Sequence, residues 1–142
     1  MAASKNKAIN HIGIVVRDHG VAAKLAAALG LAMGEPEVLQ DRGISVLKLK
    51  APNADLEFIS PISQDSEVQR FLEKRGEGIH HVCFTTTDMD GAIERFKSAG
   101  IRQIPNSRRK GAEGKEVIFF HPKDTGGILI ELEAEDGGMN ED

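Results

Sequence analysis

Two stretches of the chain decide its fold: INHIGIVVRD at residues 9–18 and IHHVCFTTTD at residues 79–88. They align at an offset of 70 residues, with identities at Ile9/Ile79, His11/His81 and Asp18/Asp88, and the same offset pairs Ala22 with Ala92 and Gly30 with Gly100 further along the chain. A second pair, ADLEFI at residues 54–59 and ILIELE at residues 128–133, aligns at an offset of 74. Because both pairs occur in the same order along the chain, we interpret them as a duplicated unit.

Each unit is expected to begin with a strand and a helix. The β-branched, apolar runs are typical of strands, at 9–16 and 79–86. Asp18 and Asp88 are expected to cap the following helices, because their side-chain oxygens can accept from free N–H groups of the first turn. Those helices are predicted at 20–29 and 89–99, ending at Gly30 and Gly100. The shorter strands that follow are predicted at 33–39, 44–50 and 54–60, and at 102–105, 116–121 and 127–134.

This order of elements predicts an α+β fold built from two tandem βαβββ modules that share one cleft. The modules span residues 8–60 and 78–134, and a linker helix at 65–75 connects them, because apolar residues recur there at helical spacing. An acidic tail follows at 135–142. The length of 142 residues indicates a single domain.

Composition excludes several classes of function. The chain has 18 Lys plus Arg against 22 Asp plus Glu, a net charge of −4, so nucleic acid is not expected as a partner. No apolar run approaches the length of a membrane span. Cys83 is the only cysteine, which fits a reducing compartment and predicts a cytoplasmic protein. Phosphate-binding, dinucleotide-binding and serine-nucleophile motifs are absent from the sequence.

The repeat places a histidine and a glutamate at equivalent positions in each unit: His11 and Glu57, then His81 and Glu131. Each histidine lies near the start of a first strand, and each glutamate lies among apolar residues of a fourth strand. A single such glutamate usually faces solvent, but buried carboxylates need a partner, and the paired placement favours a common site. Two neutral imidazoles and two carboxylates suit a divalent ion such as Co, Ni, Mn or Zn.

Further polar residues are weaker candidates. The turn His121-Pro122-Lys123-Asp124 lies between two strands, where Lys123 either binds an anionic ligand or is simply exposed. The basic residues Arg108, Arg109, Lys110 and Lys115 flank a glycine-containing loop, and they would suit a phosphate-bearing tail if they are not merely solvated.

Three more side chains are expected to have structural roles. His80 points away from the face of His81 by strand alternation, so a structural hydrogen bond is the better interpretation. His19 is expected to be a solvated surface residue. Cys83 shares the face of His81 and is expected to pack in the cleft wall, without acting as a nucleophile.

Three motifs resemble one known family: INHIGIVV at 9–16, GEGIHHV at 76–82 and VIFFHPKDTGGILIEL at 117–132. They are similar to the methylmalonyl-CoA epimerase family of the vicinal oxygen chelate superfamily, and the similarity covers residues 8–134. The double histidine and the segment from His121 to Leu132 resemble the epimerase branch in particular.

The resemblance implies a function and a site. It implies a homodimer that interconverts (R)- and (S)-methylmalonyl-CoA, a CoA thioester, by proton abstraction through a metal-stabilised enolate. The metal ligands implied are His11, Glu57, His81 and Glu131, cobalt is the expected ion, and Glu131 is the expected proton-transferring group. Some family members place a second catalytic glutamate in the third strand, but residues 43–47 contain none. The second group is therefore either another carboxylate or a water.

Three alternatives share the predicted fold. A glyoxalase I-type lactoylglutathione lyase has the same ligand types and is the strongest rival. An extradiol dioxygenase leaves one face of a three-ligand iron open, and Glu57 as a fourth ligand is evidence against it. A metal-free binding protein of the superfamily would usually lack the complete ligand set.

Overall fold

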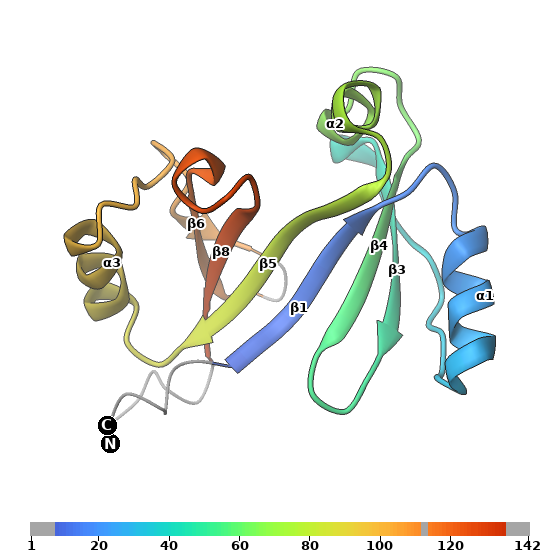
Figure 1. The fold of residues 1–142 in the computed structure, drawn as a ribbon, viewed down its shortest axis with the longest axis horizontal. Coiled ribbons are helices and arrows are strands. Elements are labelled where there is room, and N and C mark those ends of the chain that lie inside the picture. Colours follow the sequence, from blue (N-terminus) through green and yellow to red (C-terminus); the bar gives the residue numbers. More distant parts are fainter. Residues whose placement is uncertain (1–7, 112–113, 136–142) are drawn as a thin grey trace. The chain divides into compact units, whose positions relative to one another are not determined.

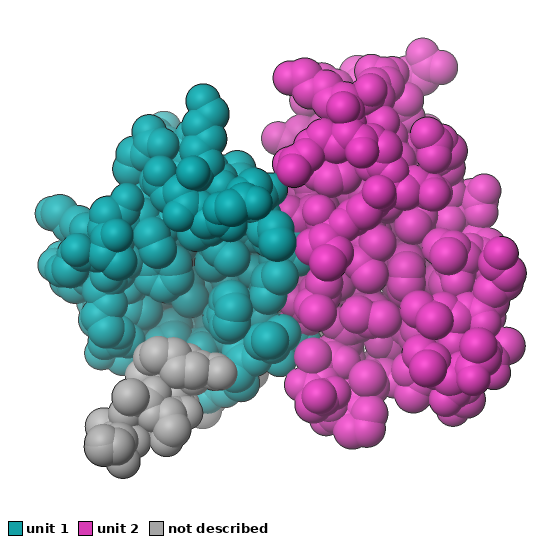
Figure 2. Space-filling model, viewed as in Figure 1, with its two compact units in different colours: residues 1–10, 81–142 teal, residues 11–80 magenta. Residues whose placement is uncertain are grey.

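A computed structural model of the chain describes residues 8–111 and 114–135. These residues form two compact units, coloured separately in Figure 2: residues 11–80, and the described residues before 11 and after 80. Within them the chain follows the βαβββ order twice, so the predicted α+β fold is confirmed. Among the described residues, no helix combines the length and apolar character needed to cross a bilayer.

The first module forms a mixed sheet (Figure 1). Its elements are β1 (Ala8–Val15), α1 (Gly20–Leu29), β2 (Glu37–Leu39), the short 3-10 turn η2 (Gln40–Arg42), β3 (Ile44–Lys50) and β4 (Asp55–Pro61). β1 pairs with β4 in parallel, and β4, β3 and β2 pair in antiparallel order. The helix α2 (Glu67–Arg75) follows, and the Ser66 side chain caps it by accepting from the Gln69 N–H at 3.0 Å.

The second module repeats this topology. Its elements are β5 (Gly78–Thr86), α3 (Met89–Ser98), β6 (Arg109–Lys110), β7 (Glu116–Phe120), the 3-10 turn η4 (Pro122–Asp124) and β8 (Leu129–Ala134). β5 pairs with β8 in parallel, and β8, β7 and β6 pair in antiparallel order.

The strand registers match under the offsets found in the sequence. In the first module Gly13 is the partner of Glu57, and in the second Cys83 is the partner of Glu131. Each of these partners lies two residues after the histidine of its module, so histidine and glutamate share a face of each sheet. The duplication inferred from weak identities is therefore also a duplication of register.

The sheet of the first module has a different apolar cluster on each face, as alternation along β3 requires. Ile44 and Val46 belong to the cluster that includes Val68 and Leu72 of α2. Leu47 and Leu49 belong to the other cluster, with the buried alanines of α1. In the second module α3 packs on β7 and β8, and the ring of Phe96 stacks on that of Phe120, with centroids 4.0 Å apart.

One predicted strand is wrong. Residues 102–105 make only a single bridge, between Gln103 and Phe120, and the edge strand is instead β6. Pro105 has no N–H to donate, and Asn106 has a φ of 61°, so the backbone turns where a ladder would have to continue. Similarly, the strand predicted at 33–39 is reduced to β2, which begins directly after Pro36.

The two helix starts differ from each other. The Asp88 side chain caps α3 as predicted, accepting from the Gly91 N–H at 3.1 Å. Asp18 accepts from the Gly20 N–H at 2.8 Å, but His19 occupies the N-cap position of α1. Of the predicted acidic tail, residues 136–142 lie outside the described part of the chain.

Candidate metal centre

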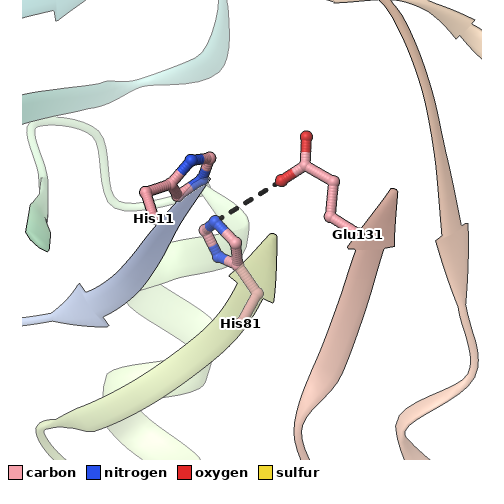
Figure 3. A group of neighbouring side chains, drawn as sticks. All are labelled: His11, His81 and Glu131. Carbon is pink, nitrogen blue, oxygen red and sulfur yellow. Dashed lines mark ion pairs between the residues drawn. The ribbon is translucent and has the colours of Figure 1, made fainter. Parts of the chain in front are cut away.

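The second module brings His81 and Glu131 together on neighbouring parallel strands. The Nε2 of His81 lies 3.6 Å from the Oε1 of Glu131, as the dashed line in Figure 3 marks. The two side chains are only 10% and 12% exposed. A carboxylate with so little contact with water needs a cation or a hydrogen-bond donor, and the imidazole beside it is one candidate.

The first module repeats the pair with His11 and Glu57. The Nδ1 of His11 lies 3.5 Å from the Oε2 of Glu57, and the side chains are 10% and 16% exposed. Burial raises the pKa of the Glu57 carboxyl, because it disfavours the charged form, while nearby Lys48 opposes that rise. The Lys48 Nζ lies 3.9 Å from the same Oε2.

Three side chains that could hold a metal ion group together: His11, His81 and Glu131 (Figure 3). One ligand atom from each lies within 4.8 Å of the others. Glu57, the fourth residue predicted from the sequence, is beside His11 in the contact described above. Imidazole nitrogens and carboxylate oxygens are the donors that Zn, Co, Ni and Mn accept, so the donor chemistry of these residues fits a divalent ion.

Lys123 lies on η4, in the predicted polar turn, and it is exposed. The turn is fixed by Arg102, whose guanidinium donates to both carboxylate oxygens of Asp124 at 2.9 and 3.1 Å. That hydrogen-bonded ion pair lowers the pKa of Asp124 to about 2. Lys123 therefore extends from a restrained turn, which suits a contact with an anionic ligand.

Two of the basic residues that the sequence grouped near residue 110, Arg108 and Arg109, already contact other side chains of the protein. Arg108 donates to Asp90 at 3.0 Å and also forms an ion pair with Glu116. The Arg109 guanidinium lies over the ring of Phe119, 5.5 Å from its centroid. Because two carboxylates pair with Arg108, its charge is already balanced within the protein, and a role of this cluster in binding a phosphate-bearing tail stays a prediction.

The sequence predicted His19 as a solvated surface residue, and that prediction is wrong. Its Nε2 lies 3.1 Å from the Oγ of Ser45 and 3.4 Å from the Oγ of Ser60. Burial lowers the pKa of His19, and Asp18 opposes this shift. The two serines are register partners on the face of the sheet opposite Glu57, so this polar cluster lies apart from the metal-ligand pair.

Lys48 is the residue near the site that the sequence analysis missed. It is the register partner of Glu57 across β3 and β4. The signal was present in the sequence: Ile44, Val46 and Lys48 alternate along one strand, which places the lysine on the face of the two apolar residues. The His80 ring packs edge-on against Phe71, and Cys83 is fully buried, while the hydrogen bond expected for His80 and the cleft-wall position expected for Cys83 stay predictions.

Comparisons with known proteins place this geometry in context. Residues 10–119 match the family model of the Glyoxalase/Bleomycin resistance protein/Dioxygenase superfamily. The chain is 40% identical over 128 residues to the ethylmalonyl-CoA/methylmalonyl-CoA epimerase of Cereibacter sphaeroides, an alignment that covers 88% of this chain and 96% of that protein.

Solved structures of methylmalonyl-CoA epimerases have a similar fold. The methylmalonyl-CoA epimerase of Mycobacterium tuberculosis superposes with a TM-score of 0.77 at 34% identity, covering 94% of this chain and 91% of that one. A methylmalonyl-CoA epimerase solved in complex with methylmalonyl-CoA and NH4+ also gives a TM-score of 0.77, at 31% identity, covering 93% of this chain and 96% of that one.

Proposed function

The chain belongs to the methylmalonyl-CoA epimerases of the glyoxalase superfamily, and on that premise we propose that it interconverts the (R)- and (S)-epimers of methylmalonyl-CoA. The observation that carries the proposal is the histidine–glutamate pair found at the same register in both modules. In this substrate the reacting carbon lies between a thioester carbonyl and a carboxylate. Its proton must leave from one face and return to the other.

We propose that His11, Glu57, His81 and Glu131 hold one divalent ion. The supporting evidence is the burial of both histidines, each 8% exposed, and the short distance from each to its glutamate. A divalent ion bound there would supply Lewis-acid stabilisation of the negative charge that develops when the substrate loses its proton. The two imidazoles must be neutral to act as ligands, so acid should release the ion.

Glu131 is the proposed proton-transferring residue. Its carboxylate is mostly withdrawn from water and lies beside the imidazole of His81. A carboxylate is a weak base in water, and one that holds a metal is weaker still. Glu131 must therefore be loosely held, or move away from the ion, when it accepts the proton.

Lys123 is proposed to contact a phosphate of the CoA portion. The support is that Lys123 is exposed and lies on a turn that the Arg102–Asp124 pair restrains. A point charge on a flexible stem suits an exposed phosphate, where geometry matters less than charge.

We also propose cobalt as the ion, a homodimer as the assembly and the cytoplasm as the location. Cobalt is compatible with the mixed nitrogen and oxygen donors. The dimer is carried over from the family resemblance. The cytoplasmic location is supported by Cys83, the single cysteine of the chain, which is buried and fits a reducing environment.

Incubation with methylmalonyl-CoA in deuterated water tests the reaction. We expect deuterium at C2 with the cobalt-loaded wild-type protein and none above background with Glu131→Gln, which keeps the size of the side chain but removes its basic oxygen. A parallel incubation with methylglyoxal and glutathione tests the lyase alternative. Consumption of the glyoxal without labelling of methylmalonyl-CoA would reverse the assignment.

A further inference from the structure

Lys48 is a cation placed directly beside a proposed metal ligand. It is the register partner of Glu57 across β3 and β4, and its Nζ lies 3.9 Å from the Glu57 Oε2. The same oxygen lies 3.5 Å from the Nδ1 of His11. One carboxylate oxygen of Glu57 thus has an imidazole and an ammonium as neighbours.

The position of Lys48 along β3 leaves its charge accessible. Ile44 and Val46, which precede it on the same face, are buried in the cluster that includes α2. Lys48 lies further along the strand, and its side chain is 43% exposed. Its main chain is held in place, because the Lys48 carbonyl accepts from the Gly34 N–H at 3.0 Å. The lysine is therefore anchored by its main chain, while its ammonium lies beside Glu57 and remains partly exposed to solvent.

The surroundings of Glu57 are otherwise unfavourable for a negative charge. Burial opposes its ionisation, and the carboxylates of Asp55 and Glu37 oppose it further, whereas Lys48 favours it. A metal ion in the site would itself stabilise the negative charge of Glu57. The positive charge of Lys48 would then no longer be required to balance that carboxylate.

Charge balance determines what such an ammonium does. Two neutral imidazoles and two carboxylates neutralise a divalent ion, so the four ligands alone leave a site without net charge. Lys48 adds one positive charge. We propose that Lys48 is a specificity-determining residue, whose charge makes the loaded site favour acyl thioesters that carry a free carboxylate over neutral thioesters. This inference rests on the proposed function and names the chemical feature of the substrate that the site selects.

The positive charge of Lys48 should affect binding of the metal ion in the opposite direction to binding of the substrate. An ammonium near a ligand carboxylate repels a divalent cation, so Lys48 should weaken metal binding while it strengthens binding of the carboxylated substrate. A purely structural role of Lys48 predicts something else: its loss would loosen the site and weaken both. The two roles therefore differ in the sign of one measurement.

The test compares Lys48→Met and Lys48→Arg with wild type, and uses Lys50→Met as the matched control. Lys50 is exposed, two residues along the same strand, and its loss changes the net charge equally. Calorimetric titration of the metal-free proteins with Co²⁺ gives the affinity for the ion. We expect Lys48→Met to bind Co²⁺ roughly threefold more tightly than wild type, given the Coulomb energy of a half-exposed pair.

The second measurement is the ratio of affinities of the cobalt-loaded proteins for malonyl-CoA and propionyl-CoA, which differ by one carboxylate. We expect that ratio to fall about fivefold in Lys48→Met and to stay near the wild-type value in Lys48→Arg and Lys50→Met. An unchanged ratio, or weaker Co²⁺ binding in Lys48→Met, would overturn the inference. Neither measurement requires turnover, so a wild-type protein that passes both but fails to label methylmalonyl-CoA overturns only the proposed reaction.

Discussion

The Oε1 of Glu131 lies 3.6 Å from the Nε2 of His81. The two residues come together because their strands, β8 and β5, pair in parallel. The relationship recurs between Glu57 and His11 at 3.5 Å. Each pair buries a carboxylate beside an imidazole, which costs free energy unless a cation joins them. Equivalent pairs in both modules are therefore better explained by a ligand-binding role than by stability.

Removing one histidine should abolish metal binding. We expect His81→Ala, loaded with Co²⁺ and desalted, to retain less than about a tenth of the metal bound by wild type, because one of the few ligands is lost. Elemental analysis of the purified proteins measures this directly. His121→Ala is the control, since that histidine lies in the η4 turn, where its Nδ1 accepts from the Lys123 N–H. Equal metal content in the two variants would contradict the assignment.

Metal loading should stabilise the fold. A ligand that binds the folded state alone, at one hundred times its dissociation constant, adds about 2.7 kcal/mol to the free energy of unfolding. For a chain of this length, that corresponds to a rise of roughly 8 °C in Tm. Thermal unfolding followed by circular dichroism, with Co²⁺ and then with excess chelator, gives the two values. A Tm that does not respond to Co²⁺ would argue for a metal-free protein.

The repeat made much of this fold predictable. Strand 44–50 was predicted with the same bounds as β3, because an apolar-rich segment of strand length lies there between the turn residues Gly43 and Pro52. The strand predicted at 102–105 failed, since a local pattern cannot show that Asn106 adopts a positive φ or that this segment makes only a single bridge to β7. Edge strands depend on their partner more than on their own residues.

The candidate site was partly predictable for the same reason. His11 and His81 follow from an identity between the two units, and their glutamates from a second alignment. The second module has no charged residue at the position equivalent to Lys48, so the repeat did not indicate that Lys48 belongs near the site. Its position there follows only from its register with Glu57. The partners of His19 were equally invisible, because Ser45 and Ser60 are distant in sequence.

The start of α3 offers a test of local stability. Asp88→Ala should lower the free energy of unfolding by about 1 kcal/mol, the usual cost of losing a helix N-cap. A Cβ added at Gly91 would collide with the Asp88 carboxylate, so Gly91→Ala should displace the same cap. Urea unfolding of both single variants and of the double variant measures the coupling. We expect the double variant to lose clearly less free energy of unfolding than the sum of the losses in the two single variants. Additive losses would show that Gly91 acts independently of the cap.

Lys123 should affect substrate binding but not the chemical step. We expect Lys123→Ala to raise KM for methylmalonyl-CoA about threefold and to leave kcat nearly unchanged, because an exposed ammonium–phosphate contact is worth only a fraction of a kcal/mol to about one. Lys74→Ala, at the end of α2, is the control for loss of an exposed lysine. A drop in kcat without a change in KM would assign Lys123 a different role.

The partly buried imidazole of His19 should make stability depend on pH. Its folded-state pKa is lowered by burial, so below the unfolded value near 6.5 the unfolded chain binds more protons than the folded one. The stabilisation is therefore fully present above pH 6.5 and is lost as pH falls below it. One ring nitrogen contacts Ser45 and Ser60, while Nδ1 is buried without a hydrogen-bond partner in the described structure.

A neutral ring tolerates that arrangement, because its unprotonated nitrogen leaves only an acceptor unsatisfied, whereas protonation would bury an unpaired N–H and a charge. Urea unfolding of the metal-free protein at pH 7.5, 6.5 and 5.5 should therefore show stability falling with pH. His19→Gln retains a polar side chain that cannot titrate, so its stability should fall less over the same range. His80, whose pKa burial also lowers, titrates in both proteins and cancels in the difference. Parallel pH profiles for wild type and His19→Gln would show that His19 is not the titrating group.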